Sequence, residues 1–126
     1  MVISVGAYLA ILAALALERV VHLALAARNA ERAFAAGAAE RGHRHYPAMA
    51  AFHALFLLSA AAEVIVFQRP FPGSVGWTAL GGALGAQALR YWSIATLGPR
   101  WNTRIIVFPG NAPIVRGPYR YLRHPN

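Results

Sequence analysis

The sequence predicts an all-α membrane protein, with about three transmembrane helices followed by a short cytoplasmic tail. Hydrophobic residues make up 58% of the 126 residues and charged residues 13%, against about 45–50% and about 25% in soluble domains. A soluble domain this small could not bury so much apolar surface in a core of its own. The bilayer is therefore the predicted solvent, and residues 1–126 are predicted to form a single membrane domain.

Three segments are long and apolar enough to be spans, which need about 20 mostly apolar residues. They cover residues 2–27, 47–67 and 75–97. The first lacks the positively charged start and the cleavage site of a secretory signal, so we expect it to stay in the protein. The third carries Gly81 and Gly85, a spacing that lets helix backbones approach closely.

The arginines predict how the spans are oriented. The chain has no lysine, so its net charge of +8 comes from arginine. Nine arginines lie in the connection after the first span and in the tail, against one in the connection after the second span. The positive-inside rule places the arginine-rich parts in the cytoplasm. We therefore expect an inner (plasma) membrane protein that contacts anionic lipid, and no nucleic-acid partner.

Several polar residues interrupt the spans. They are Glu18, Arg19 and His22 in the first, His53 and Glu63 in the second, and Gln87 and Arg90 in the third. A charge at mid-bilayer costs about 2.5–3.5 kcal/mol on insertion scales, so it usually faces a partner or a wet cavity. Glu18 and His22 share a helix face. Two interpretations stay open, a Glu–Arg pair that locks helices together and a polar pocket.

No metal site is predicted. His43 and His45 lie in the basic stretch between residues 29 and 46, where two histidines make a poor metal site, and the chain has no cysteine to add a thiolate. Zinc sites usually take three or four such ligands. A solvated inner loop is the better interpretation.

The tail, residues 98–126, is predicted to fold at the membrane surface. Gly98-Pro99 stops the third helix, and Trp101 suits an interfacial anchor. Residues 104–108 and 114–116 are typical of two short strands, a possible hairpin around the turn between them. Pro118 can open a helix at its first position, so we predict one short helical turn over residues 119–124.

The end of the tail collects groups that suit a small charged ligand. Tyr119 and Arg123 lie four residues apart on the predicted turn, as do Arg120 and His124. Such groups fit a ligand with a carboxylate or phosphate, an aromatic base and a cationic centre. The alternative is an anchor that only holds the tail to lipid headgroups. Composition favours neither, and the order of the residues decides between them.

Gly117-Pro118-Tyr119-Arg120 followed by Arg123-His124-Pro125 resembles the hallmark of the isoprenylcysteine carboxyl methyltransferase family of integral membrane methyltransferases. Other parts of the chain are similar to its bacterial branch: Leu97-Gly98 with Trp101 and Arg104, Glu18-Arg19, Arg28-Asn29, and the loop of residues 37–46 that leads to His53. The resemblance covers most of the chain, and the tail motif is its specific part.

The resemblance implies an enzyme that binds S-adenosylmethionine on the cytoplasmic side and methylates the carboxyl or hydroxyl oxygen of a lipophilic acceptor. It places these residues in the cofactor site: Gly117, Tyr119, Arg120, Arg123, His124 and Pro125. Members of the family continue past this motif with further helices and further acidic and arginine residues. We therefore expect the chain to be the N-terminal part of a longer domain, with no catalytic residue assigned within it.

Two other functions remain open. Arg123-His124-Pro125-Asn126 also matches the end of membrane sterol reductases, whose NADPH phosphates would suit arginine. The preceding Gly117-Pro118-Tyr119-Arg120 favours the methyltransferase. A small non-catalytic membrane protein with an arginine-rich, lipid-binding tail would instead show binding that weakens sharply with salt.

Overall fold

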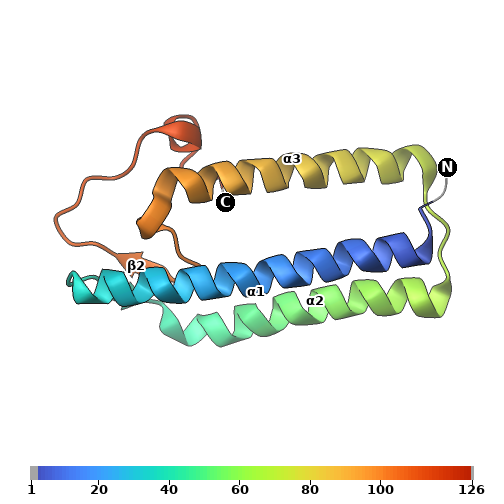
Figure 1. Cartoon of the computed structure of the whole chain (residues 1–126), viewed down its shortest axis with the longest axis horizontal. Helices are drawn as coiled ribbons and strands as arrows, with labels where there is room; N and C mark the ends of the chain where they lie inside the picture. Colours follow the sequence, from blue (N-terminus) through green and yellow to red (C-terminus); the bar gives the residue numbers. More distant parts are fainter. Residues whose placement is uncertain (1–2, 126) are drawn as a thin grey trace.

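The computed structural model describes residues 3–125, which form three long helices and a tail that folds back over one end of them (Figure 1). The helices are α1 (Val5–Ala35), α2 (Tyr46–Phe67) and α3 (Gly73–Leu97). Each predicted span falls on one of them. Residue 2, the predicted start of the first span, and Asn126, the last residue of the tail, lie outside the described residues.

Two helical segments, Val5–Ala35 and His43–Phe67, are long and apolar enough to cross a membrane. The second consists of α2 and the single 3₁₀ turn η1 (His43–His45) that leads into it. Helix α3 is also long, with 25 residues, but it is not among them, because five glycines together with Gln87 and Arg90 dilute its apolar content. The protein is therefore a mostly helical membrane protein, and a third crossing by α3 stays a prediction.

Helix α1 runs eight residues beyond the predicted end of the first span at residue 27, because hydropathy detects only its apolar part. Ser4 caps its start, with the Ser4 hydroxyl accepting from the Ala7 amide at 3.1 Å. The extension is polar on one side and buries Asn29, Ala30 and Ala33 on the other. It continues because these small and polar residues pack beneath the start of the tail.

The predicted hairpin within the tail is wrong. Strand β2 (Ile105–Val107) pairs antiparallel with β1 (Ala39–Arg41) of the first connection, with Glu40 opposite Ile106. Residues 114–116 form no strand. Two hydrogen bonds instead hold this part of the tail near the end of α3. Arg116 donates to the Thr96 carbonyl at 3.4 Å, and Arg100, just after α3, donates to the Ala112 carbonyl at 3.1 Å.

The predicted helical turn over residues 119–124 begins and ends earlier than expected. The observed element is the 3₁₀ helix η3 (Gly117–Arg120). Gly117 adopts a φ of +57° that starts the turn, and the Tyr121 and Leu122 amides both donate to the Pro118 carbonyl. This local turn closes on Pro118, so the residues after Tyr121 leave the helix.

Among the described residues, the distribution of apolar side chains is the reverse of that in a soluble protein, because most large apolar side chains are exposed. Apart from Trp101, the buried side chains where α1, α3 and the tail meet are small or polar: His22, Ala26, Asn29, Ala30, Ala33 and Ser93. Large apolar side chains such as Leu17, Phe52 and Leu84 face outward. Small and polar residues between helices with apolar residues outside are typical of membrane proteins.

Candidate functional site

The Gly-Pro-Tyr-Arg turn packs on the C-terminal end of α3. A Cβ atom on Gly117 would overlap Thr96 Oγ1 and would lie 3.2 Å from Trp92 Nε1, so the backbone touches the helix directly. Pro118 is fully buried beside it. These two residues fix the turn, because glycine allows both the close approach and the positive φ.

Tyr119 lies half-buried on the same face of α3. Burial raises the pKa of the Tyr119 hydroxyl, and a hydrogen bond with Ser93 opposes this rise. Ser93 is itself fully buried and donates to the Leu89 carbonyl at 2.8 Å. The phenol therefore stays neutral near pH 7 and can act as a hydrogen-bond donor or as an apolar ring.

The remaining predicted cofactor residues face outward. Arg120, Arg123 and His124 are exposed, and Pro125 is half-buried. The guanidinium of Arg120 lies 5.9 Å from the centre of the Tyr121 ring. The structure thus divides the six predicted residues into a supporting part, Gly117 and Tyr119 against α3, and an outward cationic part. Such a surface can bind a carboxylate or a phosphate through charge-assisted hydrogen bonds.

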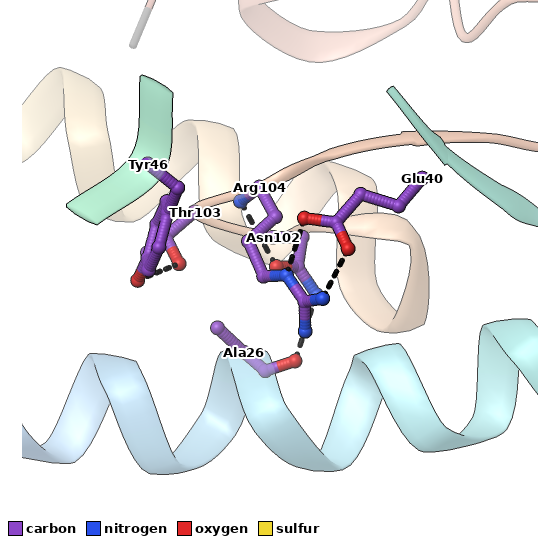
Figure 2. Close-up of polar contacts among 6 residues, drawn as sticks. All are labelled: Ala26, Glu40, Tyr46, Asn102, Thr103 and Arg104. Atoms are coloured by element: carbon purple, nitrogen blue, oxygen red, sulfur yellow. Dashed lines mark hydrogen bonds and ion pairs between the residues drawn. The ribbon is translucent and has the colours of Figure 1, made fainter. Parts of the chain in front are cut away.

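A second polar cluster fastens the start of the tail to α1 and to the first connection (Figure 2). The Asn102 amide donates to the Ala26 carbonyl at 2.7 Å, and its Oδ1 accepts from the Arg104 backbone N–H at 3.0 Å. Arg104 donates to both carboxylate oxygens of Glu40. The two-pronged hydrogen bond from Arg104 holds the pKa of Glu40 below its usual value, and Glu40 raises the pKa of Arg104.

This cluster borders an open cavity of about 440 Å³. Tyr46 and Thr103, whose hydroxyls are 3.1 Å apart, contribute to its polar wall. Its apolar wall comes from α1 and α2. The lining residues are Leu23, Ala26, Ala27, Glu40, His43, Tyr46, Pro47, Thr103 and Arg104. The sequence analysis missed this site, since its residues come from three separate segments; the polar Asn102-Thr103-Arg104 run after Trp101 was the available local signal.

A third cluster joins α1 and α3 among the apolar residues of the bundle. Glu18 accepts a hydrogen bond from Gln87, and His22 Nδ1 lies 3.5 Å from Glu18 Oε1 and 3.4 Å from Arg90 Nη2. Asn29, about two turns beyond His22 along α1, donates to the Trp101 carbonyl at 2.8 Å. These contacts link α1 to α3 through Gln87 and His22, and both the Glu–Arg pair and the polar pocket stay predictions.

Other polar residues predicted within the spans lie elsewhere. His53 Nδ1 is 2.8 Å from the Met49 carbonyl of its own helix. Glu63 pairs with Arg69 at 3.0 Å, where both side chains are more than half exposed. Within residues 3–125, no three His, Cys, Asp or Glu side chains gather as a metal site would require.

The fold and these clusters define a helical membrane protein with an arginine-bearing turn on its third long helix. The family model for the isoprenylcysteine carboxyl methyltransferase (ICMT) family matches residues 77–126, which cover most of α3 and the whole tail. The chain is 38% identical over 117 residues to "Uncharacterized protein YpbQ" of Bacillus subtilis (strain 168), an alignment that covers 92% of this chain and 68% of that protein. The chain belongs to the isoprenylcysteine carboxyl methyltransferase family, a family of membrane methyltransferases. No solved structure matches it.

Proposed function

We propose that this protein is an S-adenosylmethionine-dependent methyltransferase that O-methylates a carboxyl or hydroxyl group of a lipophilic acceptor. One observation carries the proposal. The Gly117–Arg120 turn is built onto α3 by a glycine that nothing larger could replace without overlap, and it lies within the segment that the family model matches. A rigid support for an outward cationic surface favours a defined ligand site over a loose lipid anchor.

The residues present suit the proposed cofactor, which when bound supplies an activated methyl group on a sulfonium. Arg123 is exposed and can hold the amino-acid carboxylate through two parallel hydrogen bonds. His124, also exposed, can donate or accept a hydrogen bond at the ligand's polar edge. The half-buried ring of Tyr119 offers a surface for an aromatic base or a cationic centre. Gly117 and Pro118 position these groups.

The membrane arrangement that supports this function has three spans with the tail in the cytoplasm of an inner (plasma) membrane. The first connection and the tail lie at one end of the bundle, and the α2–α3 connection lies at the other (Figure 1). The first end carries nearly all the inter-helix arginines, which favours a cytoplasmic position. The acceptor would then enter from the bilayer, and membrane lipids rather than nucleic acid would be the neighbours.

Ligand titration of the purified protein in lipid nanodiscs tests the proposal. We expect saturable binding of S-adenosylmethionine that weakens about tenfold or more in Arg123→Ala, since a charge-assisted hydrogen bond contributes about 1.5–3 kcal/mol. Arg69→Ala is the matched control, because Arg69 pairs with Glu63 far from the turn. Binding of NADPH in place of S-adenosylmethionine would instead indicate the reductase alternative, and salt-sensitive binding without saturation would indicate a lipid-binding tail.

A further inference from the structure

A second open cavity, of about 550 Å³, lies between the end of α3 and the tail segment 113–116. The helix side contributes Leu97, together with Pro99 and Arg100 of the 3₁₀ turn η2 (Gly98–Arg100). The tail side consists of the four residues that come directly before the Gly117 turn. The volume lies within the range of about 300–1,000 Å³ in which proteins bind small ligands.

The lining of this cavity carries positive charge that no acidic residue balances. Arg100 and Arg116 are the charged residues among those that line it. All four acidic residues of the chain lie at or before Glu63, and neither arginine forms an ion pair within residues 3–125. A concave surface lined by one sign of charge attracts ligands of the opposite sign. The cavity therefore favours an anion.

Both guanidinium groups are held in place and still have donors to offer. Arg100 Nη1 donates to the Ala112 carbonyl at 3.1 Å, and Arg116 Nη2 donates to the Thr96 carbonyl at 3.4 Å. The Arg100 guanidinium also lies 5.3 Å from the centre of the Phe108 ring. Because a guanidinium has several N–H donors, one carbonyl bond leaves others for a ligand. Arginine pairs with phosphate through two parallel hydrogen bonds, so these two side chains suit a phosphate group.

The rest of the lining is apolar: Leu97, Pro99, Pro113, Ile114 and Val115. The Val115 side chain is 70% exposed, so the cavity reaches the surface of the protein with an apolar residue at its edge. A free anion would gain nothing from these walls, whereas an anion with a hydrocarbon part would bury apolar surface against them. The lining therefore fits an amphiphile with an anionic head.

The cavity lies at the level where the apolar part of α1 ends. Asn29 Nδ2 donates to the Gly98 carbonyl at 3.4 Å and to the Trp101 carbonyl at 2.8 Å, so η2 packs against this part of α1. Asn29 comes shortly after residues 2–27, the predicted first span, and α1 is long and apolar enough to cross a membrane. Lipid head groups border the hydrocarbon layer. The cavity and the lipid phosphates therefore share one level.

We propose that this cavity binds the head group of an anionic phospholipid. Arg100 and Arg116 donate to the phosphate oxygens, and the apolar walls contact the adjoining part of the lipid chains. A lipid bound there bridges α3 and the residues directly before Gly117, so it fastens the tail to the membrane surface. The inference goes beyond the proposed function and does not depend on it, because neither arginine is among the six predicted cofactor residues.

Native mass spectrometry of the purified protein in detergent, titrated with dioleoylphosphatidylglycerol, tests the proposal. We expect saturable binding of a single lipid molecule to the wild type. Its dissociation constant should rise about tenfold or more in Arg116→Gln and in Arg100→Gln, since a charge-assisted hydrogen bond to phosphate is lost. Arg32→Gln is the matched control, because it removes the same charge from an exposed position on α1 that does not line the cavity. It should bind the lipid as the wild type does.

Two comparisons with the wild-type protein do not depend on a variant folding. Dioleoylphosphatidylcholine has the same phosphate and chains but a compensating positive charge, so it should bind about fivefold or more weakly. Glycerol 3-phosphate, which has the phosphate without the chains, should not displace the lipid at equal concentration.

Three results would each overturn the proposal. They are equal affinities for the two lipids, displacement by glycerol 3-phosphate, and equal affinities of Arg32→Gln and a folded Arg116→Gln. The last result would mean that the lipid responds only to the overall positive charge of the protein. The methyltransferase proposal is tested separately by the titration with S-adenosylmethionine.

Discussion

Gly117 has surroundings that only glycine tolerates. Its φ is +57°, and a Cβ atom there would overlap Thr96 Oγ1 and lie 3.0 Å from Thr96 Cγ2. The clash is with a side chain whose hydroxyl already donates to the Trp92 carbonyl at 2.8 Å, so relief would disturb α3. This residue therefore determines whether the whole turn can sit on the helix.

Gly117→Ala should lower the free energy of unfolding by about 1–3 kcal/mol, from backbone strain and overpacking together. Thermal unfolding in detergent measures it. Gly110→Ala is the control, because Gly110 also has a positive φ of +77° but open space around it. Equal losses in the two variants would show that the contact with α3 contributes nothing.

At the scale of elements, the β1–β2 ladder is the link between the first connection and the tail. It joins residues that are more than sixty positions apart, and the Glu40–Arg104 pair lies beside it. Glu40 of β1 and Arg104 also line the cavity near Tyr46 and Thr103. The strength of this link therefore controls how firmly the tail is held over the ends of α1 and α2.

The ladder should loosen in acid. Arg104 lowers the pKa of Glu40 from its ordinary value of 4.5, so the pair's contribution is present above that value and is lost as the pH falls through the lowered pKa. The protection factors of the Ile105–Val107 amides, which compare the observed exchange rate with the intrinsic rate at the same pH, should fall in that range. Glu40→Gln should show the lower protection factors already at neutral pH. Glu31→Gln, an exposed change on α1, should exchange like the wild type; a Glu40→Gln ladder that stays protected would contradict the prediction.

At the scale of the whole molecule, the open question is whether α3 crosses the bilayer. The chain has no cysteine, so single-cysteine variants can report the side of each segment. We expect Ser74→Cys to react with a membrane-impermeant maleimide in intact cells. Ala36→Cys and Asn111→Cys should react only after the membrane is permeabilised. Labelling of Ser74→Cys and Asn111→Cys from the same side would show that α3 does not cross.

The sequence predicted the positions of the long helices closely, because apolar run length is a local property. The family was also predictable, since the order of Gly117, Tyr119, Arg120 and Arg123 can be recognised without coordinates. The prediction of the strand partner for residues 105–107 was wrong. Strand pairing depends on which segment the fold brings alongside, and the local pattern of residues 114–116 carried no information about the first connection.

By itself the sequence determined that this chain is a membrane protein of the methyltransferase family, because composition and motif order are properties of the chain alone. Only the tertiary structure decided which polar groups meet. Glu18 and Gln87 lie 69 positions apart, and Asn29 and Trp101 lie 72 apart. These contacts form because the helices and the tail pack side by side. Burying a polar group costs free energy unless it is hydrogen-bonded, and only the packing decides which partner it meets.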